Sequence, residues 1–159
     1  MTADYYFAYG SNMNAARVQQ RNMAFSGYIG GVLSDYKLCF NKRSQKYPGA
    51  ASANVITNSG AATEGVLYRL NTPDEIEKMD PYEGYPVRYD RVILPVCSAD
   101  GICEAWVYTA NMAYIAHGLK PARWYLDHLL AGAPLLSTAY VAMLKRVECL
   151  ENSLQEPSG

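Results

Sequence analysis

The strongest constraint on the fold is a change in hydrophobic periodicity near residue 121. Before this point, short apolar segments rich in aromatic and β-branched residues alternate with glycine, proline and asparagine turns, which is typical of β-strands. After it, apolar residues recur at helical spacing over residues 121–131 and 138–150. Strands followed by helices favour the α+β class, with the strands forming a compact, mostly closed sheet.

Turn signals set the expected element boundaries. Strands are predicted over residues 5–9, 32–40, 53–57, 64–70, 89–97 and 102–109. We expect a glycine-rich break at 27–31, a basic loop at 41–49, and a turn at 58–60 that makes a hairpin of the strands on either side of it. Helices are predicted over 14–21, capped by Asn12 or Asn14, and from Thr72 and Pro73 to about residue 80.

Length and charge limit the classes of protein that fit. The 159 residues suffice for one domain with its own hydrophobic core, which we expect to span residues 1–151, with residues 152–159 as a frayed C-terminal tail. The net charge of -1 provides no basic field, so we predict no nucleic-acid partner. The sequence shows no secretory signal and no apolar run near the ~20 residues that span a bilayer. We therefore expect a cytoplasmic protein without membrane contact.

Cysteines and histidines give no metal or redox motif. The four cysteines (Cys39, Cys97, Cys103 and Cys149) contain no CxxC pair, so we expect free thiols. His117 and His128 match no metal-ligand spacing, and no metal site is predicted. The 14 tyrosines against 3 phenylalanines fit either a core with wet edges or a polar pocket lined by phenols. Composition alone leaves both interpretations open.

The first candidate site is the segment 6–12, in which an aromatic strand ends in Gly10 and Ser11 before a helix begins. Such a corner directs several backbone N–H groups into one space, where they can bind a carboxylate or a developing oxyanion. The spaced glycines and lysine of a phosphate-binding loop are absent. On physical grounds alone, an ordinary strand–turn–helix corner with a capping asparagine is the favoured interpretation.

The second candidate site is the segment 79–89, where prolines and a glycine surround Glu83. We expect Glu83 after the preceding helix, with Tyr82, Tyr85 and Tyr89 able to shield it from water. A shielded carboxylate has a raised pKa and can act first as a base and then as an acid. The competing interpretation is a solvated turn acid followed by Gly84 as a left-handed helix terminator. Asp80 is expected to be a structural acid.

Taken in order, the two motifs resemble the γ-glutamylcyclotransferase family and its butirosin-biosynthesis and AIG2-like relatives. Segments 65–68, 105–108 and 121–125 extend the resemblance over nearly the whole chain. It implies a small, mixed, barrel-like β-sheet with a few packed helices and one pocket. It also implies Glu83 as the catalytic residue and Tyr125 as a substrate contact, with Tyr140 as the alternative. The remaining substrate-binding residues that it implies are Tyr6, Phe7, Ala8, Tyr9, Gly10 and Ser11.

The reaction that the resemblance implies is cleavage of a γ-glutamyl amide to 5-oxoproline and a free amine, by attack of the substrate's own α-amine and without a metal or organic cofactor. The amide of an amino acid or of an amine would fit, as would a γ-glutamylated biosynthetic intermediate. Segments 41–49 and 114–120 are the candidates for leaving-group contacts. Residues 12–13 depart from the glutathione-specific branch, which makes glutathione a poor candidate. A catalytically silent ligand-binding module of the same fold, and a homodimer, stay open.

Overall fold

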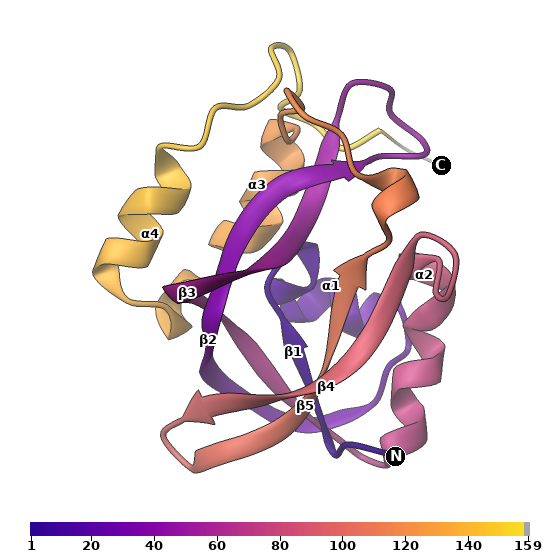
Figure 1. Ribbon diagram of the computed structural model, residues 1–159, viewed down its shortest axis with the longest axis vertical. Coiled ribbons are helices and arrows are strands. Elements are labelled where there is room, and N and C mark those ends of the chain that lie inside the picture. Colours follow the sequence, from indigo (N-terminus) through magenta and orange to yellow (C-terminus); the bar gives the residue numbers. More distant parts are fainter. Residues whose placement is uncertain (158–159) are drawn as a thin grey trace.

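The computed structural model describes residues 1–157 (Figure 1). Five strands carry the fold: β1 (Tyr5–Ala8), β2 (Phe25–Arg43), β3 (Ala51–Leu70), β4 (Tyr89–Ser98) and β5 (Gly101–Ala110). The α-helices are α1 (Ala15–Gln20), α2 (Asp80–Glu83), α3 (Arg123–Leu130) and α4 (Thr138–Lys145). The described residues also form short 3-10 helices at Ser11–Met13 (η1), Pro73–Lys78 (η2), Met112–Tyr114 (η3) and Ala133–Leu135 (η4).

The strands form a closed barrel in the order β1-β3-β2-β4-β5. Strand β1 closes it, pairing antiparallel with β3 (Tyr6 opposite Tyr68) and parallel with β5 (Tyr6 opposite Trp106). The other pairs are antiparallel. Helices α3 and α4 lie together beside the long β2–β3 hairpin (Figure 1). The predicted α+β fold with a small, mixed, barrel-like sheet and a few packed helices is therefore confirmed.

Strands β2 and β3 are far longer than predicted, because two segments expected as turns lie inside them. Gly30 and Gly31 belong to β2, where a Cβ on Gly30 would overlap the Leu135 carbonyl and one on Gly31 would lie 2.8 Å from Val96. These glycines permit close packing on a strand and do not break it. The prediction of a break at 27–31 was wrong.

The predicted hairpin around residues 58–60 was wrong as well. Segments 53–57 and 64–70 both belong to β3 and both pair with β2. Residues 58–61 bulge out where the register shifts between Ser34 and Tyr36, and the Gly60 N–H donates to the Asp35 carboxylate over 3.0 Å. The turn signal at 58–60 here marks an irregular bulge within one strand, in which residues 58–61 lie opposite Asp35.

Three helix boundaries differ from expectation. The segment after Thr72 is a 3-10 helix followed by the four-residue helix α2, so Glu83 ends a helix and does not follow it. Gly84, with φ 75°, terminates α2 in the left-handed conformation. Helix α4 stops at Lys145, well before residue 150. Of the two caps considered for α1, Asn12 and Asn14, the structure has Asn14.

The C-terminal tail contacts helices α1 and α3. Ser153 accepts a hydrogen bond from the Arg123 N–H at the start of α3, and Glu156 contacts Arg17 and His128. The division of the chain at residue 151 stays a prediction, and residues 158–159 lie outside the described part.

All four cysteines are free. No helix within residues 1–157 has the length and apolar character needed to cross a membrane.

Candidate active site

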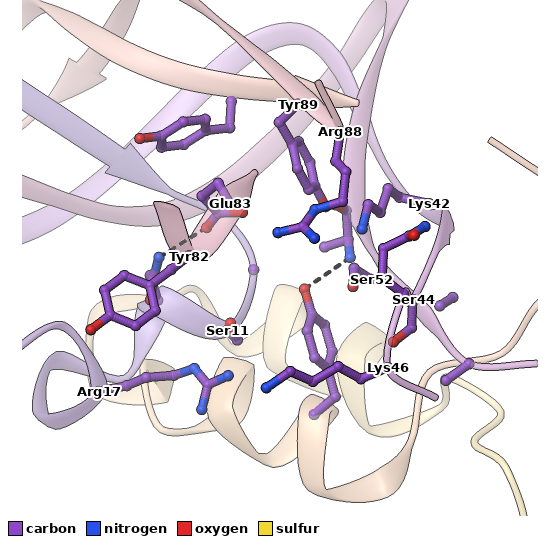
Figure 2. Close-up of a pocket in the computed structure, with 18 of the residues that line it drawn as sticks. Ser11, Arg17, Lys42, Ser44, Lys46, Ser52, Tyr82, Glu83, Arg88 and Tyr89 are labelled. Atoms are coloured by element: carbon purple, nitrogen blue, oxygen red, sulfur yellow. Dashed lines mark hydrogen bonds between the residues drawn. The ribbon is translucent and has the colours of Figure 1, made fainter. Parts of the chain in front are cut away.

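A cavity of about 310 Å³ opens where the end of β1 meets α2, α3, the β2–β3 loop and the tail (Figure 2). Its size is at the lower end of the range for small-molecule sites. The lining includes phenols, small loop residues, a cluster of cations and two carboxylates. These residues include Tyr6, Tyr9, Gly10, Ser11, Asn12, Arg17, Arg21, Lys42, Ser44, Lys46, Ala53, Tyr82, Glu83, Arg88, Tyr89, Tyr125 and Glu156.

Glu83 lies in this cavity, at the end of α2, and its side chain is only partly exposed. Its Oε1 accepts a hydrogen bond from Asn12 Nδ2 over 3.2 Å. Burial raises the pKa of the Glu83 carboxyl above its ordinary value, and the charges of Arg21 and Lys42, among others, oppose that rise without cancelling it. The carboxyl is thus suited to exchange a proton nearer to neutral pH than an exposed glutamate.

Asn12 holds Glu83 in place, a role that the sequence analysis missed. The Asn12 side chain is buried, its Nδ2 also donates to Tyr6 Oη over 3.0 Å, and its Oδ1 accepts from Arg21 over 3.1 Å. Its carbonyl oxygen accepts from Tyr68 Oη over 2.6 Å. With both ends of the amide engaged, the orientation of the donor to Glu83 is defined. The signal available in the sequence was the position of Asn12 directly after Gly10 and Ser11.

Tyr125, in α3, lines the cavity. Its hydroxyl accepts a hydrogen bond from the Ala53 N–H over 2.9 Å, so its own proton can be donated to a bound ligand. A Cβ on Gly10 would lie 3.0 Å from this hydroxyl, so glycine lets the loop and the phenol approach. Tyr140, the alternative, is buried in the core away from the cavity lining.

The structure divides the predicted substrate-binding loop into two groups. Tyr6, Tyr9, Gly10 and Ser11 line the cavity. Phe7 and Ala8 do not: their side chains are 0% and 1% exposed and pack into the hydrophobic core.

Positive charge gathers around the cavity. Five cationic side chains line it, against the carboxylates of Glu83 and Glu156. The five are Arg17, Arg21, Lys42, Lys46 and Arg88. Figure 2 shows Lys42 and Arg88 on the side of Glu83, with Arg17 and Lys46 across the cavity. Burial and then the charge of Arg88 lower the pKa of Lys42 to about 8.

Of the two segments proposed for leaving-group contacts, only one reaches the cavity. Residues 44–47 of the β2–β3 loop line it, whereas residues 114–120 do not. Lys42 and Lys46 lie in the segment predicted as a basic loop. Arg17, Arg21 and Arg88 carried no sequence signal, because only the closed barrel brings them together.

The C-terminal tail contributes Glu156 to the lining of the cavity. Glu156 accepts from His128 Nε2 over 2.8 Å and pairs with Arg17 over 3.2 Å. Burial alone would raise the pKa of Glu156, but the hydrogen bond from His128 and the charge of Arg17 outweigh it and lower that pKa. His128 is therefore part of a polar cluster at the cavity edge. Among residues 1–157, no three histidine, cysteine, aspartate or glutamate side chains are grouped to hold a metal.

Asp80 has the structural position expected for it. Its carboxylate accepts from Arg91 Nε and Nη2 over 3.0 and 3.2 Å and from Tyr108 Oη over 2.7 Å. The Arg91 guanidinium also lies 4.4 Å from the ring centroids of Tyr85 and Trp106. Asp80 does not line the cavity, and it anchors the first turn of the helix that carries Glu83.

Comparison with known proteins identifies the class to which this fold and site belong. Residues 6–126 match the family model described as gamma-glutamyl cyclotransferase, AIG2-like. The chain belongs to this family. A human gamma-glutamylcyclotransferase is 32% identical over 83 residues, which cover 50% of this chain. The match spans 43% of that relative's length.

Solved structures resemble the whole fold. A protein described as gamma-glutamyl cyclotransferase superposes with a TM-score of 0.82 at 23% identity, covering 95% of this chain and 91% of its own. YkqA from Bacillus subtilis superposes with a TM-score of 0.78 at 26% identity, covering 92% of this chain and 54% of its own. The first likeness, at this low identity, concerns the fold alone.

Proposed function

We propose that this protein is a γ-glutamylcyclotransferase, which converts a γ-glutamyl amide into 5-oxoproline and a free amine, with Glu83 as its acid–base residue. The observation that carries the proposal is the placement of Glu83, hydrogen-bonded to Asn12, in the cavity that Gly10, Ser11 and Tyr125 also line. The name of the human relative agrees with this activity. We also propose that the reaction takes place in the cytoplasm.

The reaction needs little beyond a defined conformation and one proton carrier. The α-amine and the γ-carbonyl belong to the same molecule, so holding them in contact lowers the entropic part of the barrier. Glu83 accepts a proton from the α-ammonium, and the freed amine attacks the γ-carbonyl. The bond from that carbon to the leaving nitrogen then breaks as Glu83 returns the proton to it. Glu83, ionised again, takes the second proton from the new ring nitrogen and passes it to the leaving amine, which departs as an ammonium ion.

The loop and Tyr125 supply the binding groups. We propose that backbone N–H groups of Tyr9, Gly10 and Ser11 hold the substrate α-carboxylate or the developing oxyanion. The Tyr125 hydroxyl, fixed by the Ala53 N–H, donates its proton to the same γ-glutamyl group. Phe7 and Ala8 contribute by packing that holds the strand before the loop.

The experiment that tests the proposal is release of 5-oxoproline by the purified protein. The panel contains γ-glutamyl-alanine, γ-glutamyl-ε-lysine, a γ-glutamyl polyamine and glutathione, with separate detection of free glutamate. Release of 5-oxoproline without glutamate from at least one compound supports cyclisation. Release of glutamate instead would indicate hydrolysis and contradict the mechanism.

A silent binding module of this fold is the competing function, and calorimetry separates the two. An enzyme acting on an untested conjugate still binds its product, 5-oxoproline, in the cavity. If the panel is not turned over, 5-oxoproline binding that is lost on changing Gly10 to valine would indicate an enzyme with an untested substrate, and no binding of 5-oxoproline would favour the silent module. The retained carboxyl at position 83 favours the enzyme.

The pH dependence of activity is expected to report Glu83. Because the carboxylate form is the base, kcat/KM should fall as the pH drops through the Glu83 pKa, which burial places above its ordinary value. Arg21 is the strongest of the cations that lower this pKa. Arg21→Met should therefore move the acid limb to higher pH. The exposed Arg146→Met is the control, and an acid limb that is the same in both variants would contradict the assignment.

Tyr125→Phe should raise KM about 10-fold with a smaller change in kcat, because one hydrogen bond to the γ-glutamyl group is lost. The variant also leaves the buried Ala53 N–H without its acceptor, so a lower melting temperature is expected. Tyr140→Phe is the matched control: this phenol is buried outside the cavity, and its loss should leave KM unchanged. An equal KM for wild type and Tyr125→Phe would remove Tyr125 from the site.

A further inference from the structure

The charges in the cavity do not balance. Five cations line it against two carboxylates, and one cation, Arg17, pairs with Glu156 over 3.2 Å. Within residues 1–157, no carboxylate lies within 4.0 Å of Lys42, Lys46 or Arg88. With Glu83 ionised, the cavity carries three net positive charges, five minus two. Such a site favours a negatively charged occupant.

Two of these cations are built into the wall beside Glu83. Lys42 is 5% exposed and its Nζ lies 5.4 Å from the centroid of the Tyr89 ring. Arg88 lies against the backbone of Gly84, where a Cβ would be 2.6 Å from the guanidinium carbon. Glycine at position 84 therefore serves both the left-handed turn that ends α2 and the position of Arg88. Figure 2 shows both head groups directed into the cavity.

A buried ammonium without a counter-ion is costly, and proteins keep such charges where a partner compensates them. Lys42 stays mostly protonated at neutral pH, because its pKa is lowered only to about 8. The γ-glutamyl group leaves the net charge of the cavity unchanged, since it brings one α-ammonium and one α-carboxylate. Negative charge that offsets the excess of cations would therefore come from the leaving group.

Resting on the proposed cyclotransferase activity, we propose that Lys42 and Arg88 bind carboxylate on the leaving group, and that the preferred substrates are γ-glutamyl conjugates of acidic amino acids. A leaving group with two carboxylates offsets two of the three net charges, and a neutral amino acid offsets one. A polyamine adds positive charge to a positive site and is disfavoured. Lys46, which is exposed on the β2–β3 loop, adds a further positive charge to the cavity lining.

The test compares γ-glutamyl-glutamate with γ-glutamyl-glutamine, which match in size and differ by one charge. In the wild type, kcat/KM for γ-glutamyl-glutamate should be higher by about 10- to 100-fold, the value of a hydrogen bond to a charged group. Lys42→Met and Arg88→Met should each remove most of this preference by slowing the acidic substrate. Lys37→Met, an exposed lysine on the same strand, should keep it.

Failure of this subsite is distinguishable from failure of the proposed function. If both dipeptides release 5-oxoproline with equal kcat/KM, the function stands and the acidic-leaving-group proposal is overturned. If neither is turned over, the cyclotransferase function fails for this substrate class, and calorimetry with the Glu83→Gln protein decides on the subsite. Tighter binding of γ-glutamyl-glutamate supports it, and equal binding overturns it. The wild-type comparison needs no variant, so misfolding of Lys42→Met does not affect it.

Discussion

Glu83→Gln is expected to lower kcat about 10²- to 10⁴-fold, the usual contribution of a general acid–base residue. Glutamine keeps the shape of the side chain, and its amide oxygen can still accept the hydrogen bond from Asn12 Nδ2. It cannot accept the proton of the α-ammonium. Substrate binding should therefore change much less than kcat. The measurement is 5-oxoproline release under saturating substrate, with the exposed Glu77→Gln as control. Turnover of Glu83→Gln at the wild-type rate would remove Glu83 from the mechanism.

The same variant should not lose stability at neutral pH. Folding raises the pKa of Glu83, so the protonated form is favoured by the folded state and the charged form is disfavoured. The stability that this group contributes is complete below its unfolded pKa and is lost as the pH rises through its folded pKa. At a pH above its folded pKa the wild type has lost it. The melting temperature of Glu83→Gln should thus equal or exceed that of the wild type at pH 7, and the difference should shrink toward acid pH.

Asp80→Ala is expected to lower the free energy of unfolding by about 3 kcal/mol, the lower end of the cost of breaking a buried ion pair, because this pair is partly exposed. Asp80 and Arg91 are 15% and 14% exposed, and the pair is joined by two hydrogen bonds. Removing the carboxylate leaves the Arg91 guanidinium buried between Tyr85 and Trp106 without its counter-ion. Because Asp80 begins the helix that ends in Glu83, activity should fall as well.

Urea unfolding monitored by circular dichroism measures this loss. Glu77→Ala, exposed on the preceding 3-10 helix, is the control and should change stability by about 0.5 kcal/mol or less. If the cost arises from the unpaired charge, adding Arg91→Met to Asp80→Ala should recover part of it. A double variant that is less stable than Asp80→Ala would instead show that Arg91 stabilises the fold through its stacking alone.

Local patterns predicted the parts of the site that adjacent residues determine. The strand that ends in Gly10 and Ser11, the glutamate between Pro81 and Gly84, and the helix that carries Tyr125 each depend on a few neighbouring positions. Backbone preferences act over this range, so the motifs and the α+β class could be inferred before the fold was known. The same patterns left open whether Glu83 faces solvent or a cavity.

Two glycines were wrongly predicted to break the chain, because their role depends on residues that are distant in the sequence. Gly30 and Gly31 resemble a turn in the sequence, but they lie inside a strand of 19 residues because Leu135 and Val96 pack closely against them. A glycine that permits a turn and one that permits close packing have the same sequence signal. Only the partner across the fold distinguishes them.

By itself, the sequence determined the fold class, the loop at Gly10 and Ser11, and the candidates Glu83 and Tyr125. The tertiary structure alone decided that these residues share one cavity, that Asn12 holds Glu83, and that Lys42 and Arg88 give the cavity its positive charge. The physical reason is distance along the chain. Barrel closure by β1, between β3 and β5, brings together side chains that no local periodicity connects.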